Sequence, residues 1–226
     1  MRRWISIFLC VVLLCVPVKA KPEPKYVALT FDDGPSGKFT RQLLDGLEQR
    51  GVKATFLLCG YRVQEDAETT RRIFESGHEI GLHGYSHKSM GNMNKKDIAE
   101  ELRKTLELLP EGCEPVFFRA PGGQVTPAVK AAAKETGLSI LNWSVDPRDW
   151  ATRDTGAIST AVTGQVQDGD IVLLHDMTRS SVAAALEIVD TLQRSGFTFV
   201  TVSELAKLRD VDIKPGKLYE RFPPGA

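Results

Sequence analysis

Short apolar runs alternate with segments of helical spacing along most of the chain. The run YVALTF at 26–31 is apolar and β-prone without a break, as expected for a strand buried on both faces. In 38–50, by contrast, Leu43, Leu44 and Leu47 recur at helical spacing. The alternation predicts strands at 26–31, 53–59, 78–83, 115–120, 138–145, 170–176 and 197–202, and helices at 38–50, 66–77, 94–110, 126–137, 154–166, 180–196 and 203–208.

Capping residues support several of these helices. Asn94 precedes a strongly helical segment and has Asp97 three residues on, and Thr126 precedes a proline at the first helical position. Ser203 is the predicted cap of the last helix. The tail 210–226 is polar and rich in Pro and Gly, so we expect it to pack loosely.

About seven strands alternating with helices predict one α/β domain with a parallel sheet and right-handed crossovers. An open sheet and a barrel, complete or incomplete, fit this count equally well. In either architecture the loops at the carboxyl ends of the strands carry the chemistry.

Residues 1–20 have the composition of a signal peptide. The start MRRW is basic, and the apolar run 5–16 is shorter than the ~20 residues of a spanning helix. The segment VKA at 18–20 begins and ends with small residues. The sequence therefore predicts cleavage after Ala20 and an exported domain at 21–226; an uncleaved anchor is the alternative.

The charge balance bears on the kind of partner, and the cysteines bear on disulfide bonding. Lys plus Arg and Asp plus Glu both number 29, and this balance argues against a nucleic acid as the main partner. Cys59 and Cys113 remain after cleavage, and export would permit a disulfide between them. One follows a strand and the other precedes one, however, so a parallel sheet should separate them by more than the ~7 Å that a disulfide spans.

Unusual polar residues gather where the predicted strands end. Because these ends meet at one edge of a parallel sheet, the residues should face a common site. They are Asp32 and Asp33, His83 and His87, Arg119, the group Asp146, Asp149 and Trp150, and the pair His175 and Asp176.

The spacing of His83 and His87 permits a metal site. If HGYSH turns helically, both imidazoles lie on one face; two exposed loop histidines are the plainer alternative. A carboxylate of the Asp32–Asp33 pair would complete a set with open positions for water and substrate. A dication would also offset the repulsion between the two carboxylates, although an Asx-turn at DDGP is the competing explanation. His78 begins a strand and is expected to be structural.

Taken together, the motifs identify a family resemblance. The segments TFDDG (30–34), HGYSH (83–87), RAPGG (119–123), DPRDW (146–150) and LLHD (173–176) resemble, in order and spacing, those of the polysaccharide deacetylases of carbohydrate esterase family 4. The resemblance runs from about Tyr26 to Leu208. It implies a distorted, incomplete (β/α) barrel with about seven parallel strands, and metal-dependent hydrolysis of an N-acetyl group on a sugar polymer.

The resemblance also implies residue roles. Asp32 is the expected general base, held by Arg119, and His175 is the expected acid, tuned by Asp149. The metal ligands implied are Asp33, His83 and His87, for one divalent ion that we expect to be Zn²⁺, with Co²⁺ or another divalent ion able to substitute. The expected substrate-binding residues are Pro121, Gly122, Trp150 and Leu173, with the backbone N–H after Pro121 as an oxyanion donor. Core packing for Trp150, and helix capping for Asp176, are alternatives from the residues alone.

Two positions depart from the family pattern. Gly84 stands where Ser or Thr is usual, and Gly122 stands where Tyr is usual. Because glycine keeps its backbone N–H, the loss at Gly122 affects the lining of the groove, and hence substrate selection, more than the chemistry.

Other functions stay open at this point. Fe(II) oxygenases also use two His and one carboxylate, but are expected to show an all-β pattern. A wall-glycan-binding protein with a degenerate site would bind without releasing acetate. Among substrates for a deacetylase, peptidoglycan is the first choice, and chitin oligomers or acetylxylan are the alternatives. The enzyme is expected to act as a monomer with no obligate protein partner.

Overall fold

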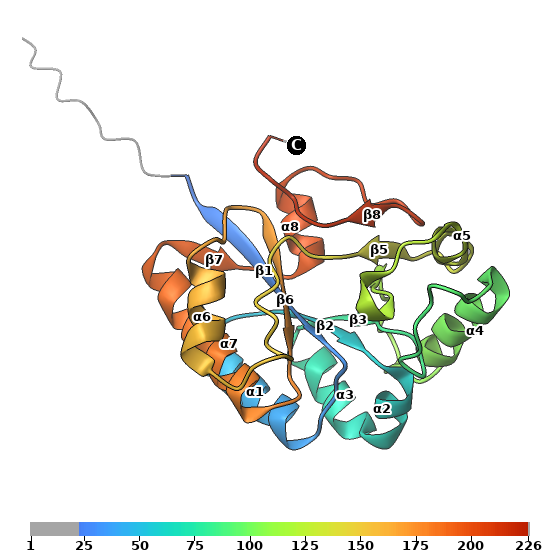
Figure 1. Ribbon diagram of the computed structural model, residues 1–226, viewed down its shortest axis with the longest axis horizontal. Coiled ribbons are helices and arrows are strands. Elements are labelled where there is room, and N and C mark those ends of the chain that lie inside the picture. Colours follow the sequence, from blue (N-terminus) through green and yellow to red (C-terminus); the bar gives the residue numbers. More distant parts are fainter. Residues whose placement is uncertain (1–22, 226) are drawn as a thin grey trace, which may run out of the picture.

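The computed structural model describes residues 23–225 (Figure 1). Its centre is an all-parallel sheet in the order β6-β1-β2-β3-β4-β5-β8, with β7 beside β1. The predicted signal peptide 1–20 lies outside the described residues. The strands are β1 (Lys25–Asp32), β2 (Thr55–Leu58), β3 (Glu79–Leu82), β4 (Phe117–Phe118), β5 (Ser139–Leu141), β6 (Asp170–His175), β7 (Phe197–Phe199) and β8 (Leu218–Tyr219).

The sheet curls into a distorted barrel, which confirms the predicted fold class. After β5 the chain turns back toward the other edge of the sheet, where Val145 forms an isolated parallel bridge with Val172 of β6. The amide of Leu173 donates to the Val145 carbonyl at 2.9 Å. An isolated bridge stands here in place of a full strand, so the barrel is closed only weakly on this side.

Helices surround the curled sheet (Figure 1). Asn94 and Thr126 cap their helices as predicted, by accepting from the amides of Asp97 and Val129. The helices are α1 (Lys38–Gln49), α2 (Gly60–Glu65), α3 (Ala67–Glu75), α4 (Lys95–Leu106), α5 (Pro127–Glu135), α6 (Thr155–Thr163), α7 (Arg179–Arg194) and α8 (Val202–Leu208), with a 3-10 turn η1 (Pro121–Gly123).

The predicted cap of α8 was wrong. Thr201 caps this helix in a capping box with Glu204, and the amide of Thr201 donates to Glu204 Oε2 at 2.8 Å. The hydroxyl and amide of Ser203 both bond to Glu79 at the start of β3. Serine and threonine are both good caps, and because Ser203 bonds to Glu79, the capping position falls to Thr201.

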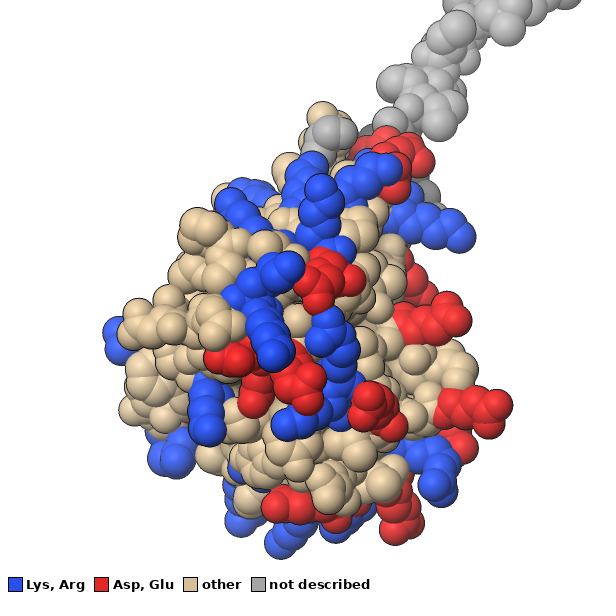
Figure 2. Space-filling model, turned by 90° about the vertical axis from the view of Figure 1, so that its right-hand side faces the viewer, with Lys and Arg blue, Asp and Glu red and all other residues tan. Residues whose placement is uncertain are grey.

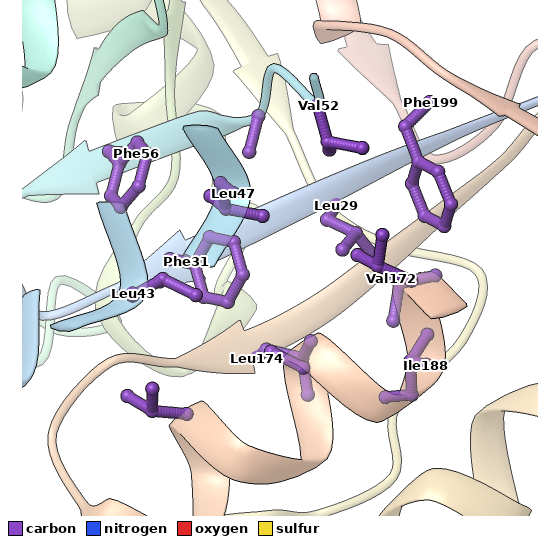
Figure 3. Close-up of a cluster of buried hydrophobic side chains, with 14 of the residues drawn as sticks. Leu29, Phe31, Leu43, Leu47, Val52, Phe56, Val172, Leu174, Ile188 and Phe199 are labelled. Atoms are coloured by element: carbon purple, nitrogen blue, oxygen red, sulfur yellow. The ribbon is translucent and has the colours of Figure 1, made fainter. Parts of the chain in front are cut away.

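The main core lies between the sheet and helices α1 and α7 (Figure 3). Strand β1 sends Leu29 and Phe31 outward into this layer, against Leu43 and Ile188. Successive strand residues point to opposite faces, so the alternate residues of β1 point into the barrel. Thr30 and Asp32 are among them, and both are buried. The pattern of β1 thus delivers a carboxylate to the barrel interior.

The tail 210–226 was expected to pack loosely, but it packs against the barrel. Strand β8 pairs with β5, and both Tyr219 and Phe222 are buried, with their rings stacked at 5.4 Å. The amide of Phe222 donates to the Gly169 carbonyl at 2.8 Å. The apolar residues of a polar tail therefore fill the barrel together with Val202 and its neighbours on α8.

Acidic and basic side chains are interspersed on the face shown in Figure 2. Glu135 pairs with both Lys95 and Arg103, as expected for a chain with balanced charge. Among the described residues, Cys59 and Cys113 are free, in agreement with the topology argument. Among residues 23–225, none of the helices is long and apolar enough to cross a membrane.

Candidate active site

The site begins where β1 ends, at two adjacent carboxylates with different surroundings. Asp32 is 3% exposed and points into the barrel. Asp33 follows with a φ of 74°, in the left-handed region that a non-glycine residue seldom adopts. This backbone turn breaks the strand alternation, so that both carboxylates can reach the same cavity.

Arg119, just after β4, holds Asp32. Its guanidinium is fully buried and donates to Asp32 Oδ1 at 2.6 Å and to Thr30 Oγ1 at 3.0 Å. Its Nε and Nη2 groups donate to the carbonyls of Leu141 and Asn142 at 3.0 and 2.9 Å. Burial lowers the pKa of Arg119, and the charge of Asp32 opposes that shift. Four of the five guanidinium N–H groups therefore have partners, and these bonds offset the cost of burying the charge.

Asp33 lies between the two histidines that follow β3. Its Oδ1 is 3.3 Å from His83 Nε2 and 2.9 Å from His87 Nε2. His83 Nδ1 donates to the Arg119 carbonyl at 2.8 Å, which leaves the Nε2 lone pair facing the carboxylate.

This arrangement fits a divalent cation. Within the described chain, Asp33 Oδ1 is buried without a hydrogen bond directed at it. One ligand atom from each of Asp33, His83 and His87 lies within 4.8 Å of the others. A lone pair facing an ionised carboxylate is repulsive unless a cation stands between them. Two imidazoles and one carboxylate are a donor set that suits Zn²⁺ and leaves coordination positions open.

The loop that carries the two histidines is not the helical turn considered above. Residues 83–87 are irregular, and Gly84 and His87 have φ values of 74° and 56°. Glu101 of α4 fixes the loop by accepting from the amides of Tyr85 and Ser86 at 2.9 and 2.7 Å. A glycine at position 84 therefore suits the backbone. The sequence did not predict the support from Glu101, because the spacing of residues does not show which later helix a loop will contact.

His175, which is held by Asp149, forms the opposite wall. Asp149 is fully buried; its Oδ1 is 2.8 Å from His175 Nδ1, and its Oδ2 accepts from the His175 amide at 2.9 Å. Burial lowers the pKa of His175, but the hydrogen bond and charge of Asp149 reverse this and raise it to about 9. The imidazole is therefore protonated at neutral pH.

A cavity of about 370 Å³ joins these groups. Of the expected substrate-binding residues, Gly122, Trp150 and Leu173 line it, whereas Pro121 is buried and is not among the lining residues. Trp150 is 54% exposed, so it does not belong to the core. The lining comprises Asp32, Asp33, His83, His87, Gly122, Trp143, Asp146, Trp150, Leu173 and His175.

Sequence reasoning missed Trp143, which lines the same cavity. A side chain at Gly123 would meet the Trp143 ring at 2.7 Å, so this glycine lets the ring lie against the RAPGG turn. Trp143 stands near the end of a predicted strand, a position that can face the site. A tryptophan there can equally belong to the core, so the sequence alone did not identify it as a site residue.

Two further acidic residues support the loops. Asp146 Oδ1 accepts from the Arg148 amide at 2.8 Å, which forms a turn beside the cavity. Asp176 does not cap α7, whose N-cap is Thr178. Its buried carboxylate accepts from Thr40 and lies under Gly34, where an added Cβ would be 3.0 Å from both oxygens. Asp176 thus packs against the turn that follows Asp33.

Comparisons with known proteins agree with this geometry. The sequence model described as polysaccharide deacetylase matches residues 19–141. A peptidoglycan-N-acetylglucosamine deacetylase of Bacillus cereus is 39% identical over 191 residues, covering 82% of this chain and 90% of that protein. The peptidoglycan-N-acetylmuramic acid deacetylase PdaC of Bacillus subtilis is 35% identical over 83% of this chain, which spans 40% of that protein.

A solved structure is similar over nearly the whole fold. The family 4 acetyl xylan esterase from Clostridium thermocellum, in complex with a cobalt ion, matches with a TM-score of 0.82 and 36% identity. The match covers 88% of this chain and 100% of that one. The relatives therefore share the fold while their names specify different polymers.

Proposed function

The chain belongs to the polysaccharide deacetylase family, and from this premise we propose that it is an exported, metal-dependent enzyme that removes N-acetyl groups from peptidoglycan. One observation carries the proposal. Asp33, His83 and His87 converge on one point, and that point lies in the same cavity as Asp32 and His175. A bound divalent ion would lower the pKa of a coordinated water and polarise the amide carbonyl.

Asp32 is placed to act as the general base. Arg119 holds its Oδ1 at 2.6 Å, while Oδ2 is 3.7 Å from His83 Nε2, on the metal side. Oδ2 can therefore accept the proton that the attacking water loses. Because the guanidinium fixes the buried carboxylate, little reorganisation accompanies the attack.

His175 is placed to act as the general acid. Its Nδ1 is bonded to Asp149, so Nε2–H is the group left to face the cavity. When the carbon–nitrogen bond breaks, this proton passes to the departing amine and the products are acetate and a free amino sugar. The raised pKa of His175, about 9, keeps the acid protonated at neutral pH.

The apolar lining suits an acetyl group. Leu173 and the two rings of Trp143 and Trp150 border the cavity and would surround a methyl group. Gly122 lies at the rim, where an added Cβ would have nothing within 4 Å, so this side is open. The open rim supports a polymeric substrate, and the Gly122 amide is our candidate oxyanion donor.

Peptidoglycan is the proposed polymer for two reasons. The Bacillus relatives reported above are deacetylases of that polymer, and the predicted signal peptide would deliver this enzyme to the wall. Acetylxylan is the second candidate, because the esterase from Clostridium thermocellum shares the fold at 36% identity. All the groups named above come from one chain, which supports action as a monomer.

The test is acetate release from purified peptidoglycan, chitin oligomers and acetylxylan, with and without a chelator. We expect release to be fastest from peptidoglycan, to stop with the chelator, and to return when Zn²⁺ is added. Release that ignores metal stripping would refute the proposal. N-terminal sequencing of the exported protein checks cleavage after Ala20, and light scattering checks the monomer.

A further inference from the structure

Two further hollows continue from the active-site cavity. A small one, of about 140 Å³, shares Asp33, Trp150 and His175 with that cavity. A larger one, of about 530 Å³, lies beyond it and shares Arg153, Met177 and Thr178 with the small hollow. Because they share lining residues, the three hollows adjoin one another in a row from the metal site past Trp150 to the start of α7, and we call this row the groove.

The two ends of this groove differ in their charged groups. At the active-site end, Asp32, Asp33 and Asp146 lie among three histidines, His83, His87 and His175. The far end carries Arg153 and Arg179, both exposed, and no Asp or Glu among the described residues that line it. The side-chain hydrogen bond of Arg153 is a long one, 3.4 Å to the Thr152 carbonyl, and not to a carboxylate. Both guanidiniums are therefore available to an anion in the groove.

The distance along the groove is short. Arg153 lines the same small hollow as His175, the group proposed to protonate the departing amine. An anion on Arg153 must therefore belong to the sugar being deacetylated or to its neighbours in the strand. Phe39, Met177 and Ala183 give the far hollow apolar walls against which a sugar ring can lie.

We propose that Arg153 and Arg179 bind a carboxylate of the glycan strand and determine the specificity of the enzyme for an anionic polymer. This inference rests on the proposed function, and it specifies that the groove selects the polymer by its negative charge. Every second sugar of peptidoglycan carries a lactyl ether, whose carboxyl group is either free or joined to a stem peptide with carboxylates of its own. Chitin lacks this charge, so the groove discriminates between polymers that offer the same N-acetyl group.

The test uses tetrasaccharides of equal length. The anionic substrate alternates N-acetylglucosamine with N-acetylmuramic acid, whose lactyl carboxyls are free. The first neutral substrate is the same molecule with these carboxyls converted to primary amides, and the second is chitotetraose. A fourth substrate carries a stem peptide on each lactyl group. The quantity measured is kcat/KM for acetate release by the metal-loaded enzyme at low salt, as a ratio of anionic to neutral substrate.

We expect Arg153→Gln and Arg179→Gln each to lower this ratio by about three- to five-fold, as for the loss of one exposed ion pair. Raising the salt to about 0.5 M should lower the wild-type ratio similarly, because exposed charges are screened. Arg71→Gln removes the same charge from an exposed position on α3 and should leave the ratio unchanged. The fourth substrate locates the anion: a kcat/KM above that of the amidated tetrasaccharide assigns it to the stem peptide, and a kcat/KM no higher than that of the amidated tetrasaccharide assigns it to the lactyl group.

Two results distinguish a failure of the proposed role of the groove from a failure of the proposed function. Acetate release with an anionic-to-neutral ratio that neither arginine substitution nor salt alters would overturn the role of the groove and leave the proposed function standing. No release from any of the four substrates by metal-loaded enzyme would overturn the function itself.

Discussion

Asp32 and Asp33 are adjacent in the chain, yet they lie in different parts of the site. In one part the charged groups are paired within the protein, and in the other a carboxylate oxygen lacks a hydrogen-bond donor. Asp32 is in the proposed acid–base half, formed by Asp32, Arg119, Asp149 and His175, where the pairs Asp32–Arg119 and Asp149–His175 are 2.6 and 2.8 Å apart. Asp33 is in the proposed metal half, formed with His83 and His87, where the buried Oδ1 has no hydrogen bond directed at it in the described chain.

The difference indicates which half depends on an ion. Buried carboxylates in the acid–base half are stabilised by the protein alone, so their positions are fixed before any ion binds. In the metal half an ionised carboxylate faces imidazole nitrogens, an arrangement that a dication stabilises. The Arg119 residue joins the halves, because its side chain holds Asp32 while its carbonyl orients His83.

Removal of the metal half should have the largest effect. We expect Asp33→Ala to abolish metal binding and to reduce acetate release by at least about a thousand-fold, because the ligand set and the activated water are lost together. Metal content by mass spectrometry and acetate release check this result. Added Zn²⁺ should raise the melting temperature of wild type but not of the variant. A variant that binds zinc as wild type does would remove Asp33 from the ligand set.

Asp32→Asn should separate the two halves. General bases contribute about 10²- to 10⁴-fold, so we expect a loss of that size in kcat while one metal ion per chain is retained. Asp45→Asn is the matched control, since its side chain is 58% exposed on α1 and pairs with Arg72. Full activity in Asp32→Asn would contradict the assigned base, and loss of metal would contradict the division into halves.

The two halves also differed in how far the sequence predicted them. Parallel strands deliver their carboxyl ends to one edge, so the convergence of Asp32, His83 and His175 followed from the order of elements. The left-handed turn at Asp33 could not be read from that order. Nor could the support of the histidine loop by Glu101, because it depends on how α4 packs.

The fold, too, was predictable from the sequence only in part. Periodicity and caps predicted the helices and the main strands, but not the short α2 and β8. These elements are fixed by what they pack against: Tyr219 of β8 is buried although the tail is polar in composition. Local patterns predict elements that bury a regular face, whereas a single buried aromatic residue in a polar segment leaves no period to detect.

Within the acid–base half, Asp149→Asn should change the pH dependence. The acid must be protonated, so activity is lost as pH rises through the His175 pKa, about 9 in the folded protein. Without the carboxylate that pKa should fall toward the ordinary ~6.5, which moves the alkaline limb to lower pH. At pH 8 we expect about a 30-fold loss, and a much smaller one near pH 6. A profile of kcat against pH with an unmoved alkaline limb would exclude His175 as the acid that Asp149 tunes.

The smallest effect should come from the support of the metal half. Glu101→Met keeps the length of the side chain but removes the acceptor for the Tyr85 and Ser86 amides, so the histidine loop should lose definition. Groups that orient metal ligands typically contribute 10- to 100-fold to affinity, and we expect about ten-fold weaker Zn²⁺ binding. Activity at saturating metal should fall much less, because Arg119 still holds Asp32 and orients His83. Glu100→Met, on the same helix with an exposed carboxylate, is the control. Titration with a competing chelator measures the affinity; equal values for both variants would mean that the loop keeps its shape without Glu101, and that the metal half is as independent of its surroundings as the acid–base half.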